Sequence, residues 1–308
     1  MESVSLSSGG QGPGARPLLV VVFNKRALGA RALGRSGMAE GLRELGIAHE
    51  IVEAKEREGA RAAAAAAAEA GHVAVAAGGD GTALDVANGL LAAGTPDPTM
   101  GLVPLGTGND LARALGRVGV GLKQALDALA EFRVRPIDVP QVKGGEYFLN
   151  VLGVGFDAEV SRRRSTHRIR WPGYFPGIAR TILDYRPQDY RLTWPEGGRK
   201  GAALMVAAMN GICEGGGFQL APHASLEDGL LDTYWIDPIS VWQFARYVWA
   251  VRWGTHERLP MVQRWQMSRF TVESDSPIRY HLDGEYRELA AGEPLDVVVH
   301  PQRLRVIV

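Results

Sequence analysis

The stretch His72–Leu91 reads HVAVAAGGDGTALDVANGLL, and it decides the fold. The apolar run His72–Ala77 is typical of a strand that is covered on both faces, as in a parallel sheet. Five residues, GGDGT, follow this strand, and the pattern after them predicts a helix. Glycines let the backbone approach a ligand closely, and the first turn of a helix offers free N–H groups and a partial positive charge. The stretch therefore predicts a strand, a phosphate-binding loop and a helix.

A second turn repeats this design further along the chain. Met100–Leu105 is the next predicted strand, and the loop Gly106–Asp110 (GTGND) leads from it into another helix. Ligands in open α/β sheets lie at the carboxyl ends of the strands, so we expect the two loops to share a nucleoside triphosphate site. The sequence has no GxxxxGK[ST] motif, and Leu111 stands where the third glycine of a GxGxxG motif would fall. A P-loop and a dinucleotide site are therefore disfavoured.

Strands and helices alternate throughout the first part of the chain. Pro17–Phe23 and Ile47–Val52 read as strands, while Gly37–Leu45 and the alanine-rich Glu58–Ala70 read as helices. This alternation predicts a parallel α/β sheet with right-handed crossovers.

After Pro136 strand-like runs follow one another without helices between most of them, which predicts a β-sandwich. The runs are Phe148–Val154, Ala203–Met209, Leu231–Ile236, Phe270–Val272, Ile278–Leu282 and Leu295–Val299. The predicted fold class is thus α/β plus all-β, with a disordered tail over 1–16, an α/β domain over 17–137 and a β-rich domain over 138–308. The last strand could return to the first domain.

Composition narrows the classes of function. Lys and Arg together number 34, as do Asp and Glu, so the balanced charge argues against nucleic acid as a partner. Cys213 is the single cysteine, which excludes a disulfide framework and a cysteine zinc site and fits a cytoplasmic protein. No apolar stretch reaches the length of a membrane span, so a lipid substrate would have to be reached from the membrane surface.

The motifs, taken in order, resemble those of the diacylglycerol kinase catalytic family, which includes bacterial lipid kinases and sphingosine kinases. The matching segments are GGDGT at Gly78–Thr82, DVANGL at Asp85–Leu90, PLGTGND at Pro104–Asp110, GVGFD at Gly153–Asp157, GGGF at Gly215–Phe218, DGLLD at Asp228–Asp232 and DGE at Asp283–Glu285. The resemblance implies an NAD kinase-like α/β domain, a β-sandwich domain, and an ATP- and Mg²⁺-dependent kinase that phosphorylates a hydroxyl of diacylglycerol or a similar lipid alcohol.

The resemblance also implies roles for particular residues. Glu285 would be the general base, with Asp80 as the alternative base and Asp283 beside it. The residues implied in nucleotide binding are Asn24, Lys25, Gly78, Gly79, Asp80, Gly81, Thr82, Asp85, Thr107, Asn109 and Asp110. From the residues alone, we expect Asp80 to face the phosphates, where it would orient metal or water; the alternative is an Asx-type turn that stabilises its own loop. Asp283 and Glu285 could belong to a solvated hairpin.

A structural magnesium is implied at Ser225, Asp228 and Leu230, with the carboxylate of Asp228 and two backbone carbonyls as ligands. A β-turn at Asp228 explains the same residues without a metal.

Two departures from the family pattern concern the nucleotide. Lys25 follows Asn24 where the family has a proline-containing loop, and Ala54 stands where a threonine is expected. Thr82 and Asp85 have the spacing of a capping box, with Asp in place of the usual Glu.

Two segments could meet a membrane. Between Ser161 and Arg191 there are eight Arg and two Asp, interleaved with Trp171, Tyr174, Phe175, Tyr185 and Tyr190. Ile239–Trp253 is an apolar, tryptophan-rich helical stretch with Arg246 and Arg252. Arginine attracts anionic head groups and aromatic side chains favour interfaces, which predicts transient contact with a membrane surface. A core helix explains the second segment as well.

Two other functions remain open at this stage. An NAD kinase shares the first loop, but the second loop and the late DGE segment argue against it. A catalytically silent lipid-binding or regulatory homologue fits the altered Asn24 loop and Ala54, and the presence of Asp80, Asp110 and Glu285 argues against it. The sequence names neither the lipid nor the oligomeric state, and it leaves a homodimer open.

Overall fold

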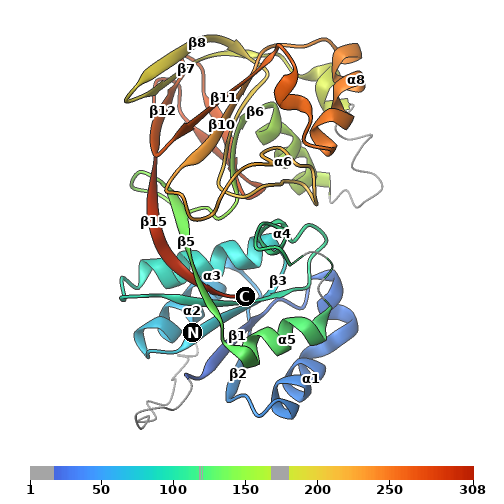
Figure 1. Cartoon of the computed structure of the whole chain (residues 1–308), viewed down its shortest axis with the longest axis vertical. Coiled ribbons are helices and arrows are strands. Elements are labelled where there is room, and N and C mark those ends of the chain that lie inside the picture. The colour runs from blue at the N-terminus through green and yellow to red at the C-terminus, as the bar shows by residue number, and fades with distance from the viewer. Residues whose placement is uncertain (1–16, 118, 120, 168–179) are drawn as a thin grey trace. The chain divides into compact units, whose positions relative to one another are not determined.

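A computed structural model describes residues 17–117, 119, 121–167 and 180–308. The predicted tail over 1–16 and the aromatic residues Trp171, Tyr174 and Phe175 lie outside the described residues. The chain forms two compact units (Figure 1). Unit 1 runs to Ile137 and includes Gln302–Val308, while unit 2 is Asp138–Pro301. Two strands pass from one unit to the other, β5 (Val134–Val142) and β15 (Leu295–Ile307).

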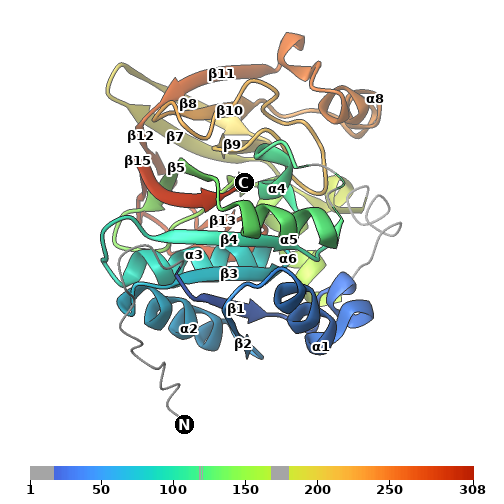
Figure 2. The same cartoon turned by 60° about the horizontal axis from the view of Figure 1, so that its bottom comes forward.

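Unit 1 is built on a parallel sheet. Its strand order is β2-β1-β3-β4, and the end of β15 pairs in parallel with β4 through Arg305 and Val306 (Figure 2). The strands are β1 (Leu19–Phe23), β2 (His49–Glu53), β3 (Val73–Gly78) and β4 (Thr99–Pro104). All five residues of β1 are buried, as are all six of β3, because helices cover both faces of the sheet.

The helices of unit 1 are α1 (Leu28–Glu44), α2 (Arg57–Glu69), α3 (Asp80–Ala92), α4 (Asp110–Ala114) and α5 (Leu122–Glu131). The strand order reverses at β1, so right-handed crossovers place α1 on one face of the sheet and α2 and α3 on the other. The alanine-rich α2 packs closely on α3. A Cβ at Gly89 of α3 would overlap the Arg61 carbonyl oxygen of α2, so the small residues set the distance between the two helices.

Unit 2 is an antiparallel β-sandwich, as the sequence predicts. One sheet has the order β11-β10-β9-β6-β13-β14; the other joins β12, β7 and β8 to the first part of β15. The strands are β6 (Val151–Gly155), β7 (Gln188–Trp194), β8 (Gly197–Ala203), β9 (Met205–Met209), β10 (Leu231–Ile236), β11 (Val262–Met267), β12 (Arg269–Glu273), β13 (Ile278–Leu282) and β14 (Glu285–Leu289).

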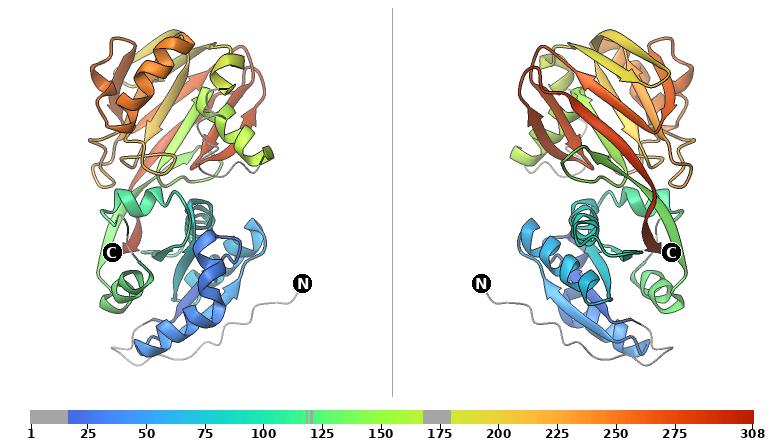
Figure 3. Two further views of the ribbon diagram at one scale, coloured as in Figure 1. Left: turned by 90° about the vertical axis from the view of Figure 1, so that its right-hand side faces the viewer. Right: turned by 90° about the vertical axis from the view of Figure 1, so that its left-hand side faces the viewer.

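Two helices cover part of the six-stranded sheet, α6 (Phe156–His167) and α8 (Val241–Arg252), and a 3₁₀ turn η1 (His256–Arg258) follows α8 (Figure 3). They share one apolar core with the sheet, in which Phe156 and Val160 of α6 and Phe244 of α8 pack beside Met205 and Tyr234.

The observed elements correct three sequence-based details. The first helix begins at Leu28 and not at Gly37, and it contains a kink at Gly34, whose φ is 68°. Helix α6 and the β7–β8 hairpin were not predicted. The proposed capping box of Thr82 and Asp85 is wrong, because the N-cap of α3 is Gly79 and no side chain caps that helix.

Candidate active site

The loops after β1, β3 and β4 meet at the carboxyl edge of the parallel sheet in unit 1. The Leu105 amide donates to the Gly78 carbonyl (2.7 Å), and the Asn24 amide donates to the Ala77 carbonyl (3.0 Å). The GGDGT and GTGND loops are packed directly together, because a Cβ at Gly106 would lie 2.5 Å from the Gly79 Cα. The structure therefore brings together the two loops that the sequence marks as phosphate-binding.

Asp80 joins these two loops through its carboxylate. Its Oδ2 accepts the Asn109 amide (2.8 Å), and its Oδ1 accepts the Asp110 amide (2.6 Å). Gly108 leaves room for this contact, since a Cβ there would lie 2.7 Å from Asp80 Oδ2. We expected this carboxylate to face the phosphates, but in the structure it holds the backbone of the second loop.

Asn109 gives the second loop its shape. Its backbone is left-handed, with φ 53°, a conformation that Asn tolerates better than most residues. Its side chain accepts the Gly106 amide (3.0 Å) and donates to the Gly106 carbonyl (2.9 Å). Asp110 is buried, whereas Thr107 is exposed at the tip of the loop and is therefore within reach of a ligand.

Three other predicted nucleotide contacts have protein partners. Asn24 Nδ2 donates to Thr82 Oγ1 (3.0 Å), which links the end of β1 to the first turn of α3. Asp85 pairs with Arg57 and Arg61 of α2, each at 3.2 Å, so it is directed to the neighbouring helix. Lys25 Nζ lies 3.4 Å from Glu53 Oε2 and is well exposed.

Gly78 and Gly81 contribute only backbone to the GGDGT loop. A Cβ at Gly78 would overlap the Thr82 side chain, so Thr82 occupies the space that a side chain would need. Gly81 lies in the first turn of α3.

In unit 2 the DGE segment forms the tight turn between β13 and β14. Asp283 and Gly284 both have positive φ (49° and 85°), as in the two-residue hairpins that favour Asp-Gly. The carboxylate of Asp283 accepts the amides of Leu149 (2.8 Å), Asn150 (2.9 Å) and Val151 (2.8 Å). Glu285 is the first residue of β14, and it is half-buried.

The segment proposed as a magnesium site is also held by hydrogen bonds. Leu230 donates its amide to Asp228 Oδ1 (3.0 Å), and Glu227 donates its amide to Ser225 Oγ (3.2 Å). The fully buried Asp138, which sequence reasoning missed, accepts the Gly229 amide (2.6 Å). Exposed Asp228 and nearby carbonyls are oxygen donors of the kind Mg²⁺ prefers, so the donor set fits the ion, and the magnesium here stays a prediction.

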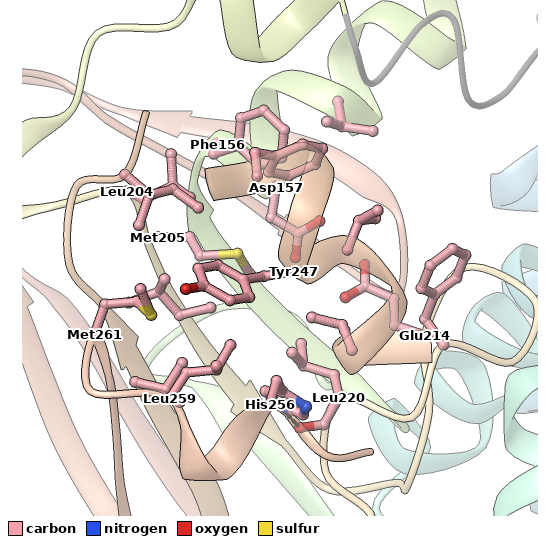
Figure 4. A pocket seen from close by; sticks show the side chains of 18 of the residues that line it. Phe156, Asp157, Leu204, Met205, Glu214, Leu220, Tyr247, His256, Leu259 and Met261 are labelled. Atoms are coloured by element: carbon pink, nitrogen blue, oxygen red, sulfur yellow. Dashed lines mark hydrogen bonds between the residues drawn. The ribbon is translucent and has the colours of Figure 1, made fainter. Parts of the chain in front are cut away.

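A cavity of about 130 Å³ lies within unit 2, between α6, α8 and the six-stranded sheet (Figure 4). Most of its lining is apolar, including Phe156, Leu220, Phe244 and Met261. Two carboxylates, Asp157 and Glu214, also line the cavity and give it one polar end. Sequence reasoning matched the GVGFD motif, which ends at Asp157, and the GGGF motif, which directly follows Glu214. It assigned these two carboxylates no role, because the lining comes from several distant segments.

The polar end includes a third group, His281 of β13, which is fully buried. Its Nε2 lies 2.9 Å from Asp157 Oδ2 and 3.2 Å from Glu214 Oε1. Its Nδ1 accepts the Gly284 amide (3.0 Å), so the proton of the neutral ring is on Nε2. Burial by itself would raise the pKa of Asp157, but its interaction with His281 and a side-chain hydrogen bond with Glu214 lower this pKa below its ordinary value.

These three side chains are the group in the described residues whose ligand atoms could surround a metal ion. The hydrogen bond at Nδ1 disfavours that use. A histidine that binds a metal through Nε2 normally carries its proton on Nδ1, where it could not accept the Gly284 amide. The trio is instead a close contact of polar groups, in which His281 Nε2 and Asp157 Oδ2 lie 2.9 Å apart without the geometry of a hydrogen bond.

The tryptophan-rich helix α8 has two different faces. Phe244, Tyr247 and Val251 line the cavity. Trp242, Trp249 and Trp253 are 85%, 55% and 66% exposed, and no residue of α8 is fully buried. The helix is therefore not a core helix: one face closes the cavity and the other presents aromatic side chains to solvent.

The arginine cluster is only partly within the described residues. Arg162 and Arg163 both donate to the buried Glu159, at 2.7–2.8 Å. The hydrogen bonds from Arg162, together with Arg163, lower the pKa of Glu159 to about 2. Among the described residues, no helix has the length and apolar character needed to cross a bilayer.

Comparison with known protein families gives two matches along the chain. The model of the diacylglycerol kinase catalytic domain matches residues 18–142. The model of the YegS C-terminal NAD kinase beta sandwich-like domain matches residues 150–308. The two matches together account for both units of the chain.

Curated relatives agree with these matches. A diacylglycerol kinase of Bacillus subtilis (strain 168) is 31% identical over 233 residues, which cover 73% of this chain and 75% of the relative. A Pseudomonas aeruginosa protein named "Probable lipid kinase YegS-like" is 32% identical over 237 residues, 75% of each chain.

Solved structures share the fold. A crystal structure from Bacillus anthracis str. Sterne superposes with a TM-score of 0.76 at 23% identity and covers 95% of this chain and 97% of that chain. A second structure, described as a diacylglycerol kinase of the same organism, has a TM-score of 0.68 at 19% identity, with 95% and 96% covered.

Proposed function

Because the chain belongs to the diacylglycerol kinase catalytic family and is therefore a kinase, we propose that it transfers the γ-phosphoryl group of ATP to a hydroxyl of diacylglycerol or a similar lipid alcohol. The observation that carries the lipid part of this proposal is the apolar cavity of unit 2 with its polar end. A chain of methylene groups would gain about 0.8 kcal/mol for each one buried there. The carboxylates at the polar end would accept hydrogen bonds from a head group.

The nucleotide belongs to unit 1 in this proposal. Backbone amides of the two glycine-containing loops and the first turn of α3 would bind the phosphates, as anions are bound at helix N-termini. Thr107 and Lys25 are exposed and would add direct contacts. Asp80, Asn109 and Thr82 would act indirectly, because their side chains hold the loops in shape. Asp85, paired with two arginines, would support α3 and not touch the phosphates.

Magnesium bound with ATP would neutralise charge that develops on the phosphates during transfer. Asp110, near the loops, is a carboxylate that could face such an ion. Ser225, Asp228 and Leu230 would hold the second, structural magnesium through one carboxylate and two carbonyls.

We place the general base at Glu285. The alternative base, Asp80, uses both carboxylate oxygens to accept backbone amides, so these oxygens are engaged in holding the second loop. Asp283 likewise accepts three amides, so it would fix the turn and not remove a proton. Glu285 follows this turn directly, so its backbone begins from a well-defined position.

The lipid would be taken from a membrane surface. Trp242, Trp249 and Trp253 form an exposed stripe on α8, the helix whose other face closes the cavity. Aromatic side chains of this kind favour the interface between water and lipid. Contact of this stripe with a membrane would bring the lipid to the cavity.

A panel of acceptors tests the proposal. The wild-type protein, with γ-labelled ATP and Mg²⁺, would be offered diacylglycerol, a sphingoid base, undecaprenol, phosphatidylglycerol and NAD. We expect label in at least one extracted lipid and none after addition of EDTA. Label in NAD alone would replace the proposal with an NAD kinase, and label in no acceptor would contradict it.

A further inference from the structure

We propose that His281 is a positioning residue that couples the polar end of the lipid cavity to the turn that carries Glu285. The inference rests on the proposed function, since it takes the cavity as the lipid site and Glu285 as the base. It assigns a role to a trio of side chains, Asp157, Glu214 and His281, that neither phosphate binding nor proton removal uses.

The first step is the direction of the hydrogen bonds at the imidazole. A backbone N–H can only donate, so Nδ1 of His281 must keep its lone pair to accept the Gly284 amide. The ring proton is then on Nε2, which faces Asp157 at 2.9 Å and Glu214 at 3.2 Å. One neutral ring thereby contacts the cavity carboxylates with one nitrogen and the turn with the other.

The second step is that both carboxylates reach the cavity. Asp157 and Glu214 belong to its lining, whereas His281 lies behind them and is inaccessible to solvent. Glu214 is held in place by a small bridge in which it exchanges two backbone hydrogen bonds with Phe218, each 2.9 Å. A lipid hydroxyl that donates to Asp157 or Glu214 would therefore change the charges and dipoles that the His281 Nε2–H faces.

The third step is the turn itself. Asp283 ties it to the Leu149–Val151 segment, and His281 ties it to β13 through the Gly284 amide. Glu285 is the next residue. Loss of the Gly284 hydrogen bond would remove one side-chain anchor of the turn, and the Glu285 backbone would gain freedom.

The fourth step is a glycine that makes the trio possible. Gly153 of β6 lies opposite His281 in the sheet. A Cβ at this position would overlap both Asp157 Oδ2 and His281 Nε2. The GVGFD motif therefore supplies the carboxylate and also the space in which it meets the imidazole.

Two substitutions separate the two halves of the coupling. In His281→Asn the side-chain oxygen can replace Nδ1 as acceptor of the Gly284 amide, but nothing reaches the carboxylates. In His281→Gln the side-chain amide can replace the Nε2–H, but nothing accepts from Gly284. We expect the Asn variant to raise KM for the lipid about tenfold with kcat nearly kept, and the Gln variant to lower kcat about tenfold with KM nearly kept.

Hydrogen exchange gives a readout that does not depend on activity. The Gly284 amide should exchange at the wild-type rate in His281→Asn and about tenfold faster in His281→Gln. Glu214→Gln, which leaves the imidazole intact, should raise KM for the lipid without changing this exchange rate. His300→Gln, in which another paired histidine of unit 2 is altered, should change neither kinetic constant.

The wild-type protein must first be shown to be active. The coupling is then overturned if the Asn and Gln variants show the same changes in kcat and in KM for the lipid, or if neither constant changes in either variant. If the Gln variant does not fold, His281→Asn decides alone, and an unchanged KM for the lipid in that variant overturns the coupling equally. Wild-type protein that labels no lipid would instead overturn the proposed function, and the coupling with it.

Discussion

The carboxylates of Asp80 and Asp283 both accept hydrogen bonds from backbone amides. Each carboxylate uses both oxygens, Asp80 for two amides of the second loop and Asp283 for three amides at the start of β6 and just before it. Hydrogen bonds from neutral amides to an ionised group contribute about 1.5–3 kcal/mol each when they are buried. Both residues therefore act on the site by fixing the segments that carry it.

Asp80→Asn should weaken nucleotide binding without removing a reacting group. The Asn side chain has one acceptor oxygen, so one of the two amides loses its partner and the second loop loosens. We expect KM for ATP to rise about tenfold and the free energy of unfolding to fall by about 1–3 kcal/mol. Isothermal binding of ATP and chemical denaturation would measure these changes. Asp127→Asn, which alters an exposed pair with Lys123, is the control and should change neither quantity.

Asp283→Asn should lower the stability of the protein and leave the turn itself intact. Asn adopts the left-handed backbone of this position as readily as Asp, so the variant isolates the loss of the carboxylate. One NH₂ group would now face backbone donors, and we expect the free energy of unfolding to fall by about 2–4 kcal/mol in urea denaturation. A variant as stable as the wild type would show that the three amides do not depend on this charge.

Glu159 gives the stability a pH dependence. Its pKa is lowered from 4.5 to about 2 by Arg162 and Arg163, so its contribution is complete above about pH 4.5 and disappears as the pH falls to 2. Glu159→Gln should therefore lower the free energy of unfolding at pH 7 by about 1–2 kcal/mol, after allowance for screening at the exposed Arg162. The difference from the wild type should vanish near pH 2; a constant difference at all pH values would contradict this account.

The sequence identified these acidic residues but could not show what they bind. The partners of Asp80 lie 29 and 30 positions away, and those of Asp283 lie 132 to 134 positions away. Nothing local in GGDGT or DGE distinguishes a carboxylate that faces a ligand from one that faces an amide. His281 was missed for a similar reason, because its neighbours Asp157 and Glu214 come from distant segments.

At the scale of elements, one face of α8 lines the cavity and the other exposes tryptophan side chains to solvent. The exposed stripe contributes little to the fold, so Trp242→Ala combined with Trp249→Ala should change the free energy of unfolding by less than about 0.5 kcal/mol. Binding to vesicles that contain anionic lipid should weaken at least tenfold, because two large interfacial side chains are lost. Co-sedimentation with vesicles measures the effect; unchanged binding would exclude this face as the membrane contact.

The packing of β6 against β13 provides a matched pair of glycine substitutions. Gly153→Ala introduces a Cβ where Asp157 and His281 meet, and we expect a loss of about 1–3 kcal/mol together with reduced lipid transfer. Gly59→Ala, in helix α2 with nothing within 4 Å of the new Cβ, should stabilise the protein by about 0.5–1 kcal/mol. Thermal denaturation of both variants tests the contrast; a neutral Gly153→Ala would mean that the trio tolerates rearrangement.

The elements that sequence patterns predicted are those with a strong local signal. The apolar strands β1, β3 and β4 and the alanine-rich α2 were found close to their observed bounds. The start of α1 was missed because Gly29 and Gly34 weaken the helical pattern, while tertiary packing against Leu105 keeps the segment helical. Helix α6 was missed because its first two residues end the GVGFD segment, which was matched to the family without a secondary structure being assigned to it.

For the whole molecule, the proposed function assigns separate parts of the chemistry to the two units. The two loops proposed to bind the triphosphate belong to unit 1, while the cavity and the turn before Glu285 belong to unit 2. The fold class could be predicted, because the alternation of strands and helices ends abruptly near Pro136. The cavity could not, since it depends on how α8 lies against β9 and β11.

The central claim is that unit 2 supplies the base for phosphoryl transfer to a lipid. Its most direct test is label transfer from γ-labelled ATP to the lipid, measured over a range of both substrates for the wild type and Glu285→Gln. We predict that the substitution lowers kcat about 10²- to 10⁴-fold and leaves both KM values nearly unchanged. A Glu285→Gln enzyme that transfers label at the wild-type rate would contradict the account.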